Sequence, residues 1–220
     1  MRIGRFTGST LSGWKGRNSC NIEVRGSAVR CPYLSDPALF DTEGPSIEPS
    51  EIMDYISSHR STLEAVCVSG GEPLAQEGIY PFLKELRKLK LPIQVSTEGT
   101  CPDTLDDLVG AGYINRAIAL IPADLRTCGH RAELLRSLEV LNSSDIEYEA
   151  VTVLLPGVSD ESTMEDIACH IRGKGILILR SFDPAKYNDP ALSGLKPMKK
   201  KDAAALRDAA RSFCRKVELR

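Results

Sequence analysis

The sequence has no apolar run close to the roughly 20 residues that cross a bilayer, and residues 1–16 lack the apolar stretch of a secretory signal. An excess of one charge is also missing. The 28 Lys and Arg against 30 Asp and Glu leave no basic footprint for a nucleic-acid backbone. Seven cysteines in 220 residues are too few for a disulfide scaffold, and their odd number indicates reduced thiols. We therefore expect a cytoplasmic protein with neither a membrane nor a nucleic-acid partner.

The signatures of several enzyme classes are absent as well. The chain has no Gly-x-Ser-x-Gly elbow and no Gly-Lys-Ser/Thr phosphate loop, which argues against a hydrolase or a nucleotide enzyme. No internal repeat or low-complexity linker divides it. An apolar content of 42% with 26% charged residues is typical of a globular protein with one good-sized core. The prediction is one domain over residues 1–220.

Short apolar runs alternate with helical patterns along most of the chain. This alternation predicts strand-helix-strand units and a parallel sheet, either open and doubly wound or curved and barrel-like. In both, ligands bind outside the carboxyl ends of the strands. A loop is predicted for residues 183–197, which are rich in Pro, Asp and Gly. Predicted strands cover 19–24, 63–68, 92–95, 114–121, 149–155 and 175–179, and predicted helices cover 49–60, 79–89, 104–109, 130–141, 161–171 and 201–214.

The second predicted strand ends in an unusual turn made of Gly70, Gly71, Glu72 and Pro73. Glycines allow positive φ angles and leave backbone groups uncovered, so main-chain hydrogen bonds could hold a small ligand close to the strand end. The alternative is a tight turn that only connects a strand to a helix, which is the commoner role of a glycine pair.

This turn, the helical pattern after it and the segment Val95–Thr100 together resemble the radical S-adenosylmethionine (radical SAM) superfamily. The chain is most similar to the activases of glycyl-radical enzymes and of anaerobic ribonucleotide reductase. Further likeness at residues 10–16, 30–33 and 156–158 extends the resemblance over nearly the whole chain.

The resemblance implies an α/β fold with a curved parallel sheet, a partial (β/α)6 TIM-like barrel. It also implies a [4Fe-4S] cluster on a C-x3-C-x2-C loop, where electron transfer cleaves S-adenosylmethionine to a 5′-deoxyadenosyl radical. Contacts to that cofactor are implied for Gly70, Gly71, Glu72, Pro73, Thr97 and Glu98.

The chain departs from this pattern at the cluster loop. The resemblance places Ser27, Cys31 and Leu34 at the three thiolate positions. Serine is a poor substitute for a thiolate, and leucine cannot coordinate iron. Leu120-Ile121-Pro122 and Val151 also replace polar residues of the family. We therefore predict a degenerate cluster-binding loop without the standard radical chemistry, and we assign no catalytic residue.

Two functions stay open. The first is binding of a protein partner, either an intact radical SAM paralogue or a large radical enzyme, together with an S-adenosylmethionine-like ligand. The second is an active radical SAM activating enzyme whose cluster uses Cys31, Cys101 and Cys128, which follow the first, third and fourth predicted strands. Under this second hypothesis, His130 would supply a fourth ligand to zinc or to a cluster. Without a C-x2-C pair, the spacing favours unrelated cysteines.

Two further expectations concern the same edge of the sheet. Cys101 begins a predicted helix, whose dipole would favour its thiolate form. Glu72 and Glu98 are either a general acid-base pair or acceptors of backbone hydrogen bonds at helix starts, and the second role is the commoner one.

Overall fold

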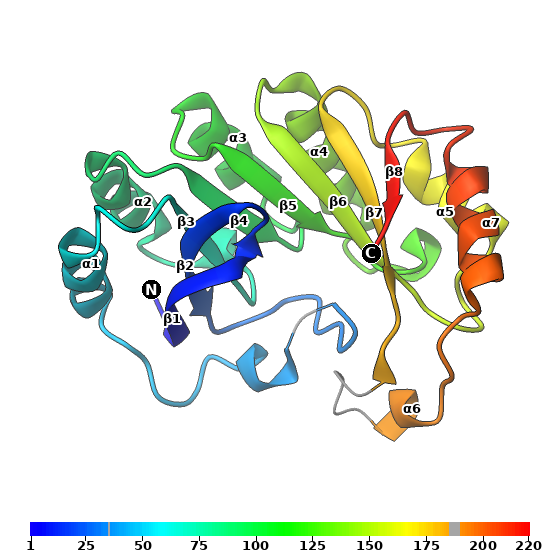
Figure 1. The fold of residues 1–220 in the computed structure, drawn as a ribbon, viewed down its shortest axis with the longest axis horizontal. Helices are drawn as coiled ribbons and strands as arrows, with labels where there is room; N and C mark the ends of the chain where they lie inside the picture. Colours follow the sequence, from blue (N-terminus) through cyan, green and yellow to red (C-terminus); the bar gives the residue numbers. More distant parts are fainter. Residues whose placement is uncertain (35, 185–189) are drawn as a thin grey trace.

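The fold is built on one sheet of eight strands in the order β1 to β8 (Figure 1). The computed structural model describes residues 1–34, 36–184 and 190–220. β1 is antiparallel to β2, and every other neighbouring pair is parallel. The strands are β1 (Ile3–Trp14), β2 (Arg17–Val24), β3 (Ala65–Gly70), β4 (Ile93–Thr97), β5 (Arg116–Leu120), β6 (Glu147–Leu154), β7 (Gly175–Ser181) and β8 (Val217–Leu219).

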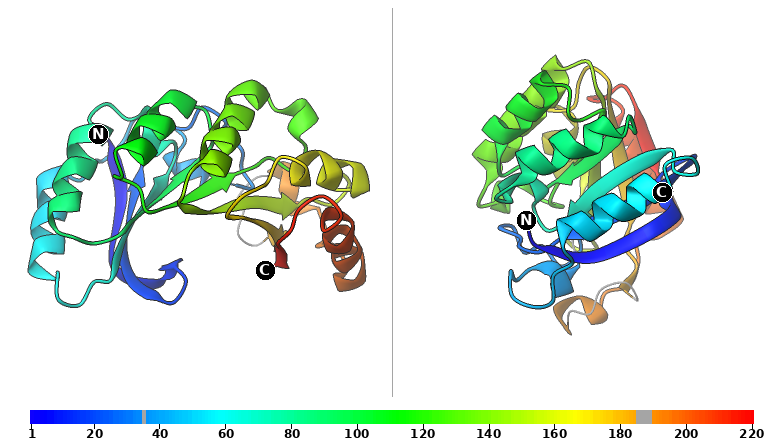
Figure 2. Two further views of the ribbon diagram at one scale, coloured as in Figure 1. Left: turned by 90° about the horizontal axis from the view of Figure 1, so that it is seen from above. Right: turned by 90° about the vertical axis from the view of Figure 1, so that its left-hand side faces the viewer.

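Helices connect the parallel strands and cover the convex face of the curved sheet, opposite its concave face (Figure 2). The helices are α1 (Pro49–Ser58), α2 (Ile79–Lys88), α3 (Pro102–Gly110), α4 (Arg131–Ser143), α5 (Glu161–Ala168), α6 (Pro190–Ser193) and α7 (Lys200–Ala210). Three short 3-10 turns are η1 (Pro37–Leu39), η2 (Pro73–Ala75) and η3 (Leu125–Thr127). In the part of the chain so described, no helix is long and apolar enough to cross a membrane.

The main core lies between the sheet and these helices. Strand residues that point to the helical side, such as Ile22, Val68 and Val95, are fully buried there. On α2, Leu83 and Leu86 are fully buried because they lie on the same helical stripe. Because β2 to β8 are parallel, their carboxyl ends lie along one edge of the sheet, where a site can form.

The predicted fold class is confirmed, but the sequence prediction of six strands is incomplete. The described residues contain eight strands, and β1 and β8 are the two that were not predicted. β1 lies at an edge of the sheet and buries little beyond Ile3, so it lacks the apolar alternation by which strands are detected. β8 has only three residues. The strand predicted as the first is therefore β2.

The predicted loop 183–197 is described only in part. Residues 190–193 form the short helix α6, so the loop prediction is wrong there, because Pro190 can begin a helical turn. Residues 185–189 of this prediction lie outside the described residues.

Candidate functional site

The glycine turn after β3 is clamped to the loop that follows β2. Gly71 N–H donates to Val24 O at 2.9 Å, and Glu72 N–H donates to Gly26 O at 2.7 Å. Gly70 has a φ of +105°, a region that favours glycine. A Cβ on Gly71 would lie only 2.1 Å from Gly26 O. The close packing of the turn backbone against the backbone of the β2 loop thus requires both glycines, whether or not the turn binds a ligand.

The Glu72 side chain joins this turn to the end of β4. Its carboxylate accepts hydrogen bonds from Leu74 N at 3.0 Å, from Thr97 Oγ1 at 2.8 Å and from Glu98 N at 2.7 Å. The side chain is buried, and burial raises its pKa to about 7 even though these donors favour the charged form. The predicted segments 70–73 and 97–98 therefore meet, and Glu72 accepts backbone hydrogen bonds, the commoner of its two expected roles.

The Glu98 carboxylate faces the loop after β2. It accepts a hydrogen bond from Ser27 Oγ at 2.5 Å and one from Val29 N at 3.3 Å. Ser27 Oγ in turn accepts a hydrogen bond from Arg30 N at 3.0 Å. Ser27 and Glu98 are both buried. The first of the three expected ligand positions thus forms part of a hydrogen-bonded link between the β2 and β4 ends.

The other two expected ligand positions differ in their surroundings. Cys31 is buried, and this burial raises the pKa of its thiol. Leu34 packs against an apolar cluster on the concave side that includes Val153, Leu155 and Phe182. Only one of the three positions carries a sulfur donor, and another is part of an apolar contact.

The three cysteines proposed as alternative ligands are only partly brought together. Cys31 and Cys128 line one cavity of about 390 Å³, and His130 lies on its wall. Cys101 is not among the residues that line this cavity; it caps α3 beside Thr100. Within residues 1–34, 36–184 and 190–220, no group of three or more His, Cys, Asp or Glu side chains is arranged to hold a metal ion. The metal role of Cys31, Cys101 and Cys128 stays a prediction.

The expected thiolate character of Cys101 is wrong. The residue does begin a helix, as predicted. Burial, followed by the negative charge of Glu72, nevertheless raises the pKa of its thiol. At this position, desolvation and a nearby carboxylate outweigh the helix dipole.

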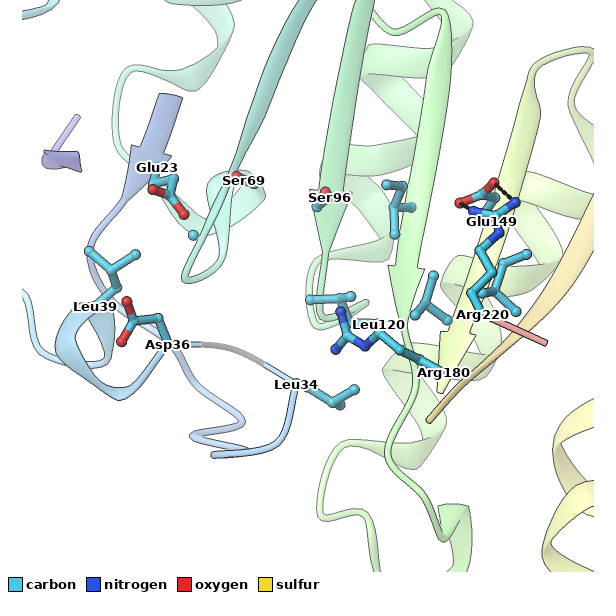
Figure 3. Close-up of a pocket in the computed structure, with 14 residues that line it drawn as sticks. Glu23, Leu34, Asp36, Leu39, Ser69, Ser96, Leu120, Glu149, Arg180 and Arg220 are labelled. Carbon is cyan, nitrogen blue, oxygen red and sulfur yellow. Dashed lines mark hydrogen bonds and ion pairs between the residues drawn. The ribbon is translucent and has the colours of Figure 1, made fainter. Parts of the chain in front are cut away.

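A second cavity, of about 310 Å³, opens on the concave face beside the glycine turn (Figure 3). Ser69, Gly70 and Ser96 line it at the ends of β3 and β4. Figure 3 shows Glu23 and Asp36 on one side of this cavity, and Glu149, Arg180 and Arg220 on the other. Its apolar wall comes from Leu34, Leu39, Ile118, Leu120, Val151 and Ile178.

The sequence prediction missed these charged residues. Glu23 lies on the polar side of the predicted first strand, which turns out to be the concave side. Arg180 follows the sixth predicted strand directly. Applying the rule about carboxyl ends to all six strands would have identified it.

A curved, mostly parallel sheet with a glycine turn and a cavity at the carboxyl ends of its strands is the architecture in which α/β proteins bind ligands at that edge. The family model of the radical SAM superfamily matches residues 25–168. The chain belongs to the radical SAM superfamily.

Among curated proteins, the chain is 22% identical over 218 residues to a protein of Methanocaldococcus jannaschii named "Putative glycyl-radical enzyme activating enzyme". This match covers 92% of the chain and 88% of the relative. The chain is thus related to a protein with an activating-enzyme description, as the sequence predicts.

Solved structures share the fold. A radical SAM methyltransferase from Sphaerobacter thermophilus matches with a TM-score of 0.70 and 15% identity, over 94% of this chain and 67% of that one. SuiB from Streptococcus suis, solved bound to S-adenosylmethionine, matches with a TM-score of 0.65 and 10% identity, over 90% of this chain. The chain spans about half of SuiB, 51% of its length. At these identities the likeness concerns the fold alone.

Proposed function

We propose that this protein keeps the radical SAM fold, as one domain over residues 1–220, but works by binding instead of standard radical chemistry. Its partners are a protein, either an intact radical SAM paralogue or a large radical enzyme, and an S-adenosylmethionine-like ligand held beside the glycine turn. We place it in the cytoplasm. SuiB has also been solved bound to its precursor peptide SuiA, and this supports a protein partner for a chain of this fold.

The hydrogen bond between Ser27 and Glu98 carries the proposal. A [4Fe-4S] cluster needs soft thiolate donors, whereas this position offers a hydroxyl that donates to a carboxylate at 2.5 Å. Leu34, packed on an apolar cluster, has no donor atom at all. The residues at these positions do not fit a cluster held by three thiolates.

Restoring the thiolates tests this assignment. We expect the double variant S27C/L34C to bind about four iron atoms per chain after anaerobic reconstitution with iron and sulfide, because the loop then offers three thiols. The wild type is expected to hold far less than one cluster per chain. Iron and sulfide analysis with electron paramagnetic resonance measures both.

The single variant S27C is the matched control, since two thiols at this loop are too few. A reduced-cluster signal in the wild type, with release of 5′-deoxyadenosine, would contradict the proposal. If the double variant stayed free of iron, the loss would lie in the shape of the loop instead of its donor atoms.

An active activating enzyme is the second candidate. One observation favours it: Cys31 and Cys128 line the same cavity with His130. The same reconstitution decides between the two, because a cluster on these residues would form in the wild type and would be lost in C128S.

A further inference from the structure

The concave cavity near Gly70 contains three carboxylates, and each of them is held by an arginine. Glu23 and Asp36 bind the Arg5 guanidinium at 3.1 Å and 2.8 Å. Glu149 binds Arg116 at 2.7 Å and Arg220 at 2.8 Å. Each carboxylate of the cavity therefore already has an arginine partner, so none of them explains the presence of a further cation.

Arg180 is that further cation. Within residues 1–34, 36–184 and 190–220, its single acceptor is Tyr33 O, at the long distance of 3.5 Å from Nη2, and its buried Nε has no partner. None of the described carboxylates forms an ion pair with it. Figure 3 shows its side chain reaching from β7 toward the middle of the cavity. A half-buried guanidinium without an anion is costly, and its planar fork fits a carboxylate.

The rest of the cavity restricts the class of anion. Ile118, Leu120, Val151 and Ile178 make an apolar wall near Arg180, which suits an apolar ligand body. On the opposite side, the two carboxylates Glu23 and Asp36 share one arginine, Arg5. This acidic side would repel a ligand with several negative charges. A ligand with one negative charge and an apolar or cationic remainder fits both the Arg180 side and the acidic side of the cavity.

We propose that the cavity binds a small organic carboxylate, with the carboxylate on Arg180 and the body of the ligand against the β5 to β7 wall. This inference deepens the proposed function, because it rests on a retained ligand site beside the glycine turn. The carboxylate belongs either to an S-adenosylmethionine-like ligand or to a separate organic acid.

Matched pairs of probes compare a carboxylate ligand with a counterpart that lacks the anionic group. We would measure binding of S-adenosylmethionine against decarboxylated S-adenosylmethionine, and of 4-phenylbutyrate against 4-phenylbutyramide, by calorimetry and ligand-observed NMR. In at least one pair, the acid is expected to bind about ten-fold more tightly or better, since hydrogen bonds to charged groups are the strong ones. The pair in which the acid binds more tightly shows whether the carboxylate belongs to an S-adenosylmethionine-like ligand or to a separate organic acid.

Variants of Arg180 test whether this residue causes the tighter binding of the carboxylate ligand. R180M is expected to abolish the difference within the pair, and R180K to keep part of it because the positive charge remains. R136M is the matched control, since Arg136 lies on α4 and pairs with Asp103; its acid preference should equal that of the wild type. The proposal is overturned if neither carboxylate ligand is preferred over its counterpart without the anionic group, or if the preference persists in R180M.

One measurement on the wild type avoids any doubt about the folding of variants. The Nε–H resonance of Arg180 should shift on addition of the preferred carboxylate ligand and not on addition of its counterpart, because this N–H has no acceptor among the described residues. A resonance that stays in place with both acids overturns the proposal. If S-adenosylmethionine binds the wild type and R180M equally, the proposed function survives and the role of Arg180 does not.

Discussion

Replacing Gly71 by alanine is expected to destabilise the protein by about 3 kcal/mol or more, because overpacking at a site with no room moves the backbone. The new Cβ would lie 2.1 Å from Gly26 O and 2.6 Å from Gly26 C, both backbone atoms. Relief of this clash would separate the glycine turn from the β2 loop and lengthen the bond from Glu72 N–H to Gly26 O. Unfolding in urea measures the loss of stability.

The same substitution at Gly110 provides the control. Gly110 is the last residue of α3, and a Cβ there has no atom within 4 Å. G110A is expected to be as stable as the wild type or up to about 1 kcal/mol more stable, since alanine restricts the unfolded chain and favours a helix. If G71A were as stable as G110A, the two backbones would not be in close contact.

The fold could be predicted where the chain carries strong periodicity. The pattern of residues 79–89 predicts α2 because Phe82, Leu83 and Leu86 recur at helical spacing, and the structure buries all three. β1 offers no comparable signal. It gains its stability from pairing with β2 at the sheet edge instead of from burial, and pairing partners are not visible in the pattern of a single strand.

The sequence predicts which turns form the site, but not the side-chain contacts between them. Parallel strands place their carboxyl ends side by side, so the approach of Glu72 to Thr97 follows from the topology. The contact between Ser27 and Glu98 joins residues 71 positions apart, and it depends on side-chain directions that periodicity does not encode. That no described carboxylate pairs with Arg180 is equally a property of its neighbours, because the carboxylates that line the cavity already have arginine partners.

Burial of Glu72 has a consequence for the pH dependence of stability. Its pKa is raised from 4.5 to about 7 in the folded protein, so the folded state binds this proton more tightly than the unfolded state does. The contribution of Glu72 to the free energy of unfolding is fully present below about pH 4.5 and is lost as the pH rises through about 7. The loss between about pH 5 and about pH 8.5 is on the order of 3 kcal/mol.

E72Q tests this dependence, because the amide stays neutral at every pH. Its NH₂ group cannot accept a hydrogen bond, so either Leu74 N, which donates to Oε1 of Glu72, or Glu98 N, which donates to Oε2, loses its acceptor. We therefore expect E72Q to be about 1–3 kcal/mol less stable than the wild type near pH 5. As the pH rises to about 8.5, the gap should close or reverse, because only the wild type buries a growing negative charge.

The difference between the two proteins isolates Glu72 from the other titrating groups. Burial and the positive charge of Arg131 lower the pKa of His170, so its contribution to stability falls toward acidic pH, opposite in sign to that of Glu72. Because His170 is present in both proteins, its effect cancels. E51Q, which removes one exposed charge from the first turn of α1, controls for the net charge of the molecule. A gap between wild type and E72Q that stays constant over this pH range would mean that Glu72 is ionised in the fold throughout, held by its donors in spite of its burial.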